Sequence, residues 1–183
     1  MGRPCAFDRD EAIKTAMQLF LEKGYEATSV EDLTSALNIS RASLYNAFGD
    51  KHGLLLASFD CAAKSGVGPL DRTAPVRDVL RLFFENLAAQ NRGCFFLTLG
   101  AELSSHDEEV RQRVDRSLEA TRTHFRELIE AARQRGELRS DIDTERASNA
   151  LLGVTVSILT LARVHPDRQV IASVIDQALQ ILA

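Results

Sequence analysis

The chain has 183 residues, of which 45% are hydrophobic and 26% charged, and its formal net charge is −4. This ordinary globular composition weighs against a disordered, a collagen-like or a disulfide-stapled protein. The mild acidity gives no support to nucleic-acid binding, because domains with that function are often strongly basic.

The prolines indicate long helices. The chain has four of them, and none interrupts the spans between Pro4 and Pro69 or between Pro75 and Pro166. Because proline is the strongest helix breaker, this distribution argues against a loop-rich sandwich. No strand-like alternation is visible, so we expect an all-α fold of about nine helices.

The first helix is expected over residues 9–23, with Gly24 as its stop. Thr28 and Ser29 then offer an N-cap, and Glu31 stands three residues after Thr28 in a capping-box pattern. A short second helix follows and ends at Asn38, one of the few non-glycine residues that tolerate a left-handed backbone.

Ser40 can cap a third helix over residues 41–48, and a fourth is expected over residues 51–64. Residues 65–75 hold two glycines and two prolines and form the clearest linker. Five further helices are expected over residues 76–90, 94–104, 107–135, 144–164 and 167 to the end.

No feature suggests a membrane protein, a metal site or a cofactor site. The longest uncharged stretch has 16 residues, between Arg146 and Arg163, and it contains polar side chains. A spanning helix needs about 20 mostly apolar residues, so we expect a buried helix here. The N-terminus has no apolar secretory segment, and the three cysteines form no CxxC pair. We expect a reduced, cytoplasmic setting with no membrane partner.

Residues 28–51 carry the pattern that indicates function. Two short helices are joined by a tight turn, which is the helix-turn-helix arrangement whose second helix enters the DNA major groove. Leu33, Ile39, Leu44 and Phe48 can pack the two helices together. The opposite face carries Arg41, Ala42, Ser43 and Asn46.

These side chains suit DNA. Arg41 can donate two hydrogen bonds to a guanine edge, and Asn46 can pair with adenine, although Asn46 can also simply be solvated. The Tyr45 hydroxyl can reach a phosphate, or the ring can be a half-buried packing residue. Thr28, Ser29 and Lys51 stand at helix starts, where backbone N–H groups attract phosphates.

Residues 24–55, GYEATSVEDLTSALNISRASLYNAFGDKHGLL, resemble the DNA-binding module of TetR-type transcriptional repressors. The resemblance covers roughly residues 7–58, and beyond them only helix count and order match. It implies a homodimer with a three-helix helix-turn-helix domain (residues 1–50) and a helical ligand-binding and dimerisation domain (residues 51–183, with 51–65 as connecting helix). Two positions depart from the family pattern: Asn38 stands where glycine is common, and Ala47 where histidine is common.

The resemblance also implies roles for single residues. Phosphate contacts fall on Thr28, Ser29, Tyr45 and Lys51, and base contacts on Arg41, Ala42, Ser43 and Asn46. Arg3 belongs to a tripeptide, Gly-Arg-Pro, that some members lay in the minor groove, where an arginine is physically sensible. A solvated arm is the alternative for Arg3.

The C-terminal part offers candidates for an effector pocket. In a TetR-type fold the equivalent helices surround a cavity, and aromatic side chains can line it. The same rings can instead be plain core. The candidates are Phe59, Phe83, Phe84, Cys94, Phe95, Phe96 and Phe125. Cys94 follows Gly93 at a helix start, where a thiolate is stabilised, so it is either an oxidant- or electrophile-sensing thiol or a small buried hydrophobe.

The last two helices carry more apolar surface than one core needs. A helix that is apolar on several faces must be buried from several sides. We therefore expect a two-fold dimer with a four-helix interface. The expected interface residues are Leu152, Thr155, Leu159, Val170, Val174, Ile175, Ala178 and Ile181.

The sequence therefore predicts a regulator, most simply a repressor, that binds palindromic double-stranded DNA as a homodimer and is released by a small-molecule effector. Oxidation at Cys94 is the nearer alternative to that effector. An all-helical enzyme or binding protein is the more distant alternative, although no enzyme motif is present.

Overall fold

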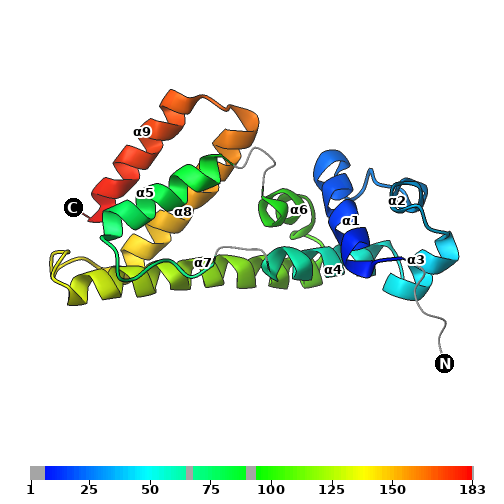
Figure 1. Ribbon diagram of the computed structural model, residues 1–183, viewed down its shortest axis with the longest axis horizontal. Coiled ribbons are helices and arrows are strands. Elements are labelled where there is room, and N and C mark those ends of the chain that lie inside the picture. The colour runs from blue at the N-terminus through cyan, green and yellow to red at the C-terminus, as the bar shows by residue number, and fades with distance from the viewer. Residues whose placement is uncertain (1–6, 65–67, 90–93, 183) are drawn as a thin grey trace. The chain divides into compact units, whose positions relative to one another are not determined.

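Helices make up all of the regular secondary structure in the described part of the chain. The computed structural model describes residues 7–64, 68–89 and 94–182. These ranges hold nine α-helices, one short 3-10 helix and no strand (Figure 1). The all-α fold of about nine helices is therefore confirmed. The elements are α1 (Arg9–Lys23), α2 (Val30–Leu37), α3 (Arg41–Phe48), α4 (Lys51–Lys64), α5 (Val76–Ala88), α6 (Phe95–Leu103), α7 (Glu108–Gln134), α8 (Thr144–Val164), α9 (Arg168–Ala178) and the 3-10 helix η1 (Leu179–Leu182).

Helix α1 begins and ends where its sequence predicts. The Asp8 carboxylate accepts hydrogen bonds from the backbone N–H groups of Asp10 and Glu11 at 2.9 and 3.2 Å. These bonds satisfy two of the N–H groups that a helix start leaves without partners. Gly24 ends the helix with a φ of +83°, a conformation that side chains disfavour.

The start of α2 corrects one prediction. The N-cap is Ser29, and the capping box pairs Ser29 with Asp32 instead of Thr28 with Glu31. Ser29 Oγ accepts from the Asp32 N–H at 3.0 Å, and the Asp32 carboxylate accepts from the Ser29 N–H at 2.9 Å. The Thr28 hydroxyl instead points back along the chain and donates to the Gly24 carbonyl at 2.6 Å.

The last helix is shorter than predicted. The sequence predicts a helix from Asp167 to the end of the chain, but α9 ends at Ala178 and residues Leu179–Leu182 tighten into the 3-10 helix η1. A tightened last turn is a common way to satisfy the carbonyl groups at a helix end. At the other end, Asp167 caps α9 through its carboxylate.

Packing groups the chain into two compact units. Unit 1 comprises residues 1–66 and 95–115, and unit 2 comprises residues 67–94 and 116–183. Helix α7 therefore contributes its first turns to unit 1 and the rest to unit 2. This grouping places α4 and α6 with the first three helices, whereas the predicted division follows chain order, with residues 1–50 before 51–183. Because packing does not define functional domains, the division at residues 50 and 51 stays a prediction.

Unit 1 has its own apolar core. Phe20, Leu33, Leu44, Leu54 and Phe59 are fully buried and come from four different helices. Helix α1 packs against α2, α4 and α6, and α3 packs against α2 and α4. The core therefore fixes the position of α3 relative to α1 and α4.

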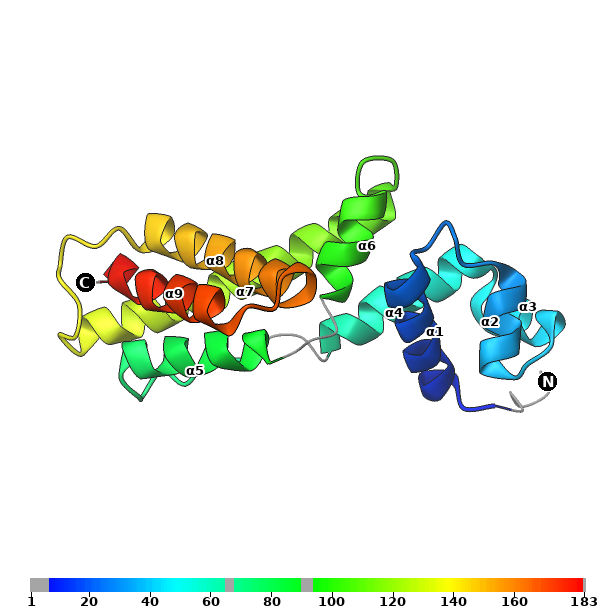
Figure 2. The ribbon, with the colours of Figure 1, turned by 90° about the horizontal axis from the view of Figure 1, so that it is seen from above.

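Unit 2 is built mainly from α5, α8 and α9, which lie alongside one another in Figure 2 and contact one another. Leu80, Phe84, Phe125, Leu128 and Leu151 are fully buried in it. Within the described ranges, α8 is the one helix long and apolar enough to cross a membrane, with a mean hydropathy of 1.5. Length and composition alone are weak support for a span, and two of the leucine and isoleucine side chains of α8 are fully buried inside the unit.

Asn38 takes the left-handed conformation that its place after α2 predicts, with φ of +51° and ψ of +46°. Alanine pays a steric cost there that glycine does not. We expect Asn38→Ala to lower the free energy of unfolding by about 1 kcal/mol and Asn38→Gly to change it by only a few tenths. Urea unfolding of the three proteins measures the difference. Equal midpoints for Asn38→Ala and the natural chain would contradict the role of the left-handed turn.

Candidate nucleic-acid interface

Helices α2 and α3 form a helix-turn-helix in the described structure. Leu33 of α2 and Leu44 of α3 are fully buried between the helices of unit 1, and Ile39 in the turn is half-buried. The Ile39 N–H donates to the Thr34 carbonyl at 3.1 Å, which closes the end of α2. Ser40 Oγ accepts from the Ser43 N–H at 3.1 Å and caps α3. The apolar contacts and the caps together fix the angle between the two helices.

One face of α3 is open. Arg41, Ala42, Tyr45 and Asn46 are exposed, as their predicted role requires. Tyr45 keeps 45% of its surface exposed, so this ring is not a core residue. Ser43 is half-buried, and its hydroxyl lies 2.9 Å from that of Ser40. Four of the five predicted groove-facing side chains on α3 are thus free of the core.

Arg41 forms an ion pair with Glu31 on the surface of unit 1. The two side chains are 57% and 66% exposed. Exposed ion pairs contribute little stability, because water screens them and ordering two long side chains costs entropy. The Arg41 guanidinium can therefore exchange Glu31 for another hydrogen-bond acceptor at small cost.

Thr28 and Lys51 are engaged within the fold, and a phosphate contact from either residue stays a prediction. Thr28 is fully buried. Lys51 Nζ donates to the Tyr25 and Thr28 carbonyls at 2.9 and 3.0 Å and lies 4.1 Å from the centre of the Tyr25 ring. Both side chains hold the loop between α1 and α2.

Two further predicted contacts have different outcomes. The Ser29 residue is exposed, but its hydroxyl is engaged in the capping box with Asp32. A phosphate contact from Ser29 stays a prediction. Arg3 lies outside the described residues.

The electrostatics around the start of α2 are set by hydrogen bonds. Lys23 Nζ lies 2.7 Å from Asp32 Oδ1, and this bond, followed by those from Ser29, holds the pKa of the Asp32 carboxyl far below its usual range. The first turn of α2 thus stays negatively charged, which suits a helix N-terminus. The same charge disfavours phosphate close to Asp32.

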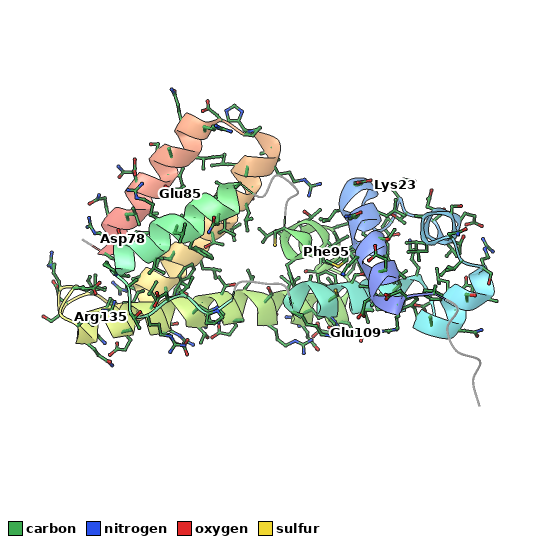
Figure 3. All side chains as sticks on the ribbon, viewed as in Figure 1. Lys23, Asp78, Glu85, Phe95, Glu109 and Arg135 are labelled. Atoms are coloured by element: carbon green, nitrogen blue, oxygen red, sulfur yellow. The ribbon has the colours of Figure 1, made fainter. Side chains whose placement is uncertain are left out.

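The six phenylalanines among the predicted effector-pocket residues form two aromatic clusters, one in each unit. In unit 1, Phe59 packs edge-on against Phe95 and Phe96, with ring centres 4.8 and 5.3 Å apart. Figure 3 labels Phe95 on α6. In unit 2, Phe83 packs against Phe84 and Phe125 at 5.3 and 5.5 Å. The two clusters belong to different units, and a role of these rings in an effector cavity stays a prediction.

Cys94 is a free, half-buried thiol immediately before α6. Its two interpretations, a sensor and a small packing residue, both stay predictions. Within the ranges that the structure describes, no three histidine, cysteine or acidic side chains gather as a metal site would require.

Unit 2 contains a hollow that the sequence does not predict. It has a volume of about 610 Å³ and lies between α5, α8 and α9. Its lining includes the apolar residues Ala162, Ile171 and Ile175 and the charged residues Arg81 and Arg168. These residues are spread over almost a hundred positions of the chain, so no local pattern indicates that they meet.

The predicted dimer residues divide by burial. Thr155, Leu159, Ile175 and Ala178 are buried within the single chain, where they already serve as core residues, and their part in an interface stays a prediction. Leu152, Val170, Val174 and Ile181 remain half-buried or exposed.

Both parts of the chain match known protein families. Residues 12–58 match the family described as "Bacterial regulatory proteins, tetR family". Residues 69–178, more than half of the chain, match "Tetracyclin repressor-like, C-terminal domain". The matches are to transcriptional regulators and not to enzymes.

Individual relatives agree with these matches. The chain is 28% identical to YezE, an uncharacterised HTH-type transcriptional regulator of Bacillus subtilis, over 193 residues that cover all of both chains. It is 35% identical over 119 residues to the HTH-type transcriptional repressor BdcR of Escherichia coli, which covers 60% of this chain and 59% of that protein.

Solved structures share the fold. A cysteine-substituted form of the TetR family regulator CifR, in complex with a 26-base-pair double-stranded operator DNA, is 27% identical. It superposes with a TM-score of 0.82 over the whole of both chains. A TetR family regulator from Cytophaga hutchinsonii is 21% identical, with a TM-score of 0.79 over 93% of this chain and 90% of that one, which shows the fold alone.

The loop between α1 and α2 makes a prediction about pH. Burial, and then the charges of Glu26, Asp50 and Asp107, raise the pKa of Tyr25 from 10.0 to about 12. The neutral phenol is thus favoured in the fold, and its contribution to stability is complete below pH 10 and is lost as the pH rises through 12. We expect tyrosinate absorbance to show a step at about pH 12. The step is expected to disappear in Tyr25→Phe and to persist in Tyr45→Phe, and the opposite assignment would contradict the burial of Tyr25.

Proposed function

The chain belongs to the TetR family of transcriptional regulators, and from this membership we propose that it is a homodimeric repressor that binds a palindromic operator and is released by a small-molecule effector. It is a DNA-binding regulator with an N-terminal helix-turn-helix. As such it acts where bacterial DNA is, in the cytoplasm.

The open face of α3 is the observation that carries this proposal. Its exposed side chains combine a guanidinium, a methyl group, a phenol and a carboxamide, on Arg41, Ala42, Tyr45 and Asn46. Arginine recognises the guanine edge by two hydrogen bonds, asparagine recognises adenine in the same way, and a methyl side chain packs on the thymine methyl group. The Tyr45 hydroxyl suits a phosphate.

The charge of the DNA-binding part favours binding by two subunits together. Residues 1–53 hold six basic and eight acidic residues, so their net charge is −2. The structure engages Lys51 and Lys23 in contacts within the unit. Few cations are then left for phosphates, and non-specific affinity is modest. Two recognition helices bound together, about 34–36 Å apart on successive major grooves, compensate for the weak single contact.

The exposed apolar faces of α8 and α9 support the dimer. Val170 of α9 is 39% exposed and Val164 at the end of α8 is 69% exposed. Gly153 on α8 faces open space, where a partner helix can approach closely. Two such helices from each subunit make the four-helix interface of a two-fold dimer.

The hollow between α5, α8 and α9 supports an effector site in unit 2. Its volume of about 610 Å³ lies within the range of small-molecule pockets. Its lining combines apolar side chains with Arg81, Glu85 and Arg168, a few polar groups that could orient a ligand. An effector that binds one dimer geometry better by about 1–3 kcal/mol suffices to weaken operator binding.

Selection of bound duplexes from a random pool tests DNA recognition. We expect the natural chain to enrich a palindrome whose half-sites are about one helical turn apart. In Arg41→Ala, the preferred base at one position of each half-site is expected to relax, with a loss of about 1–3 kcal/mol for the best sequence.

Tyr45→Phe is the matched variant, because it removes a hydroxyl from the same face of α3. It is expected to weaken all sequences about equally and to leave the enriched sequence unchanged. An unchanged base preference in Arg41→Ala would remove Arg41 from sequence recognition. No enriched sequence at all, at physiological salt, would overturn the proposed function.

The dimer is tested by sedimentation. A carboxylate on the exposed face of α9 has to be desolvated when two copies associate, so Val170→Asp is expected to be a monomer at micromolar concentrations where the natural chain is a dimer. Leu82→Asp is the control, because Leu82 is an exposed apolar residue on α5, 61% accessible. Dissociation by Leu82→Asp with a dimeric Val170→Asp would place the interface elsewhere.

A further inference from the structure

Glu102 on α6 binds the backbone of the loop that leads into the helix-turn-helix. Its Oε2 accepts a hydrogen bond from the Tyr25 N–H at 3.1 Å, and its Oε1 accepts one from the Glu26 N–H at 2.9 Å. The two carboxylate oxygens thus each accept a hydrogen bond from one of two successive backbone amides, which lie 77 and 76 residues away in the chain. Hydrogen bonds to an ionised acceptor are stronger than those between neutral groups.

The approach of Glu102 depends on a glycine. A Cβ on Gly24 would lie 3.1 Å from Glu102 Oε2, closer than ordinary van der Waals contact. Gly24 also has the positive φ that ends α1. The same residue therefore turns the chain and leaves room for the carboxylate.

The loop is held from a second helix as well. Lys51, the first residue of α4, donates to the carbonyls of Tyr25 and Thr28. Two N–H groups of the loop are thus bound from α6, and two of its carbonyl groups are bound from α4. The loop ends at Ser29, the N-cap of α2, so its position determines where α2 begins.

Helix α6 is itself anchored on α4. Phe95 and Phe96 pack on Phe59, and the His52 imidazole of α4 lies 2.8 Å from the carboxylate of Asp107, which follows α6. Glu102 thus extends from a helix that is fixed on the same unit. A displacement of α6 along α4 would draw the loop with it or break the two hydrogen bonds.

We propose that Glu102 is a positioning residue for DNA recognition: it holds residues 24–28 and thereby the start of α2 in the position from which α3 reaches the major groove. This inference rests on the proposed DNA-binding function. Glu102 makes no DNA contact in it and acts through the loop.

The test compares Glu102→Gln with the natural chain. Glutamine keeps the size of the side chain but offers one acceptor oxygen, and its NH₂ group faces a backbone N–H that needs an acceptor. We expect hydrogen exchange at the Tyr25 and Glu26 amides to become at least several-fold faster. We expect affinity for the selected operator to fall about tenfold, since a hydrogen bond to a charged group is lost.

Whether the affinity for DNA falls or rises in Glu102→Gln distinguishes a positioning role from a simple effect of charge. Removal of a negative charge should by itself strengthen binding to DNA. The control is Glu109→Gln, which removes the same charge from the exposed first turn of α7 in unit 1 (Figure 3). It is expected to leave amide exchange unchanged and to bind the operator as well as the natural chain or slightly better. The salt dependence of binding should be the same in all three proteins, because no phosphate contact is removed.

Each outcome decides the proposal. Weaker binding of Glu102→Gln with faster exchange of the two amides supports it. Operator binding equal to that of Glu109→Gln, or unchanged exchange, overturns it. If thermal unfolding shows that Glu102→Gln does not fold, Glu102→Asp, which keeps the charge and is one methylene shorter, is measured in the same way with the same expectations. A natural chain that binds no duplex would instead overturn the DNA-binding function, while amide exchange would still report the contact of Glu102 with the loop.

Discussion

The backbone of the loop between α1 and α2 must keep its polar groups hydrogen-bonded, and the rest of unit 1 depends on how this is done. A buried N–H or C=O group without a partner costs about as much as a lost hydrogen bond. Here the partners are side chains: Thr28, Lys51 and Glu102 each bind backbone atoms of the loop. These polar groups are consequently committed to the fold.

The polar residues of the DNA-binding part therefore fall into two groups, those that bind the loop backbone and those that face solvent. Side chains next to the loop stabilise the start of α2. Those on the open face of α3 remain exposed, since their helix satisfies its own backbone. The open face of α3 carries Arg41 and Asn46, and the ion pair with Glu31 restrains Arg41 only weakly. The division of labour between loop and recognition helix therefore follows from where the backbone lacks partners.

Local structure could be predicted closely from the sequence. The bounds of α1, α3 and α4 and the left-handed Asn38 follow from caps, breakers and helical periodicity, which act within a few residues. The buried roles of Leu33, Leu44 and Phe48 follow from the same periodicity. The shift of the capping box to Ser29 and Asp32 shows the limit, because two adjacent residues offered equivalent caps.

Long-range contacts decided the rest. Whether a phenylalanine lines a cavity or fills a core depends on which helices it meets, and Phe59 and Phe125 meet different ones in different units. Lys51 binds loop carbonyls that lie 23 and 26 residues away in the chain. The local sequence pattern around Lys51 does not indicate these contacts. The sequence by itself determined the helices, the turn and the face of α3, because those depend on neighbours in the chain. Only the tertiary structure decided which polar side chains are already bound, because their partners lie far away along it.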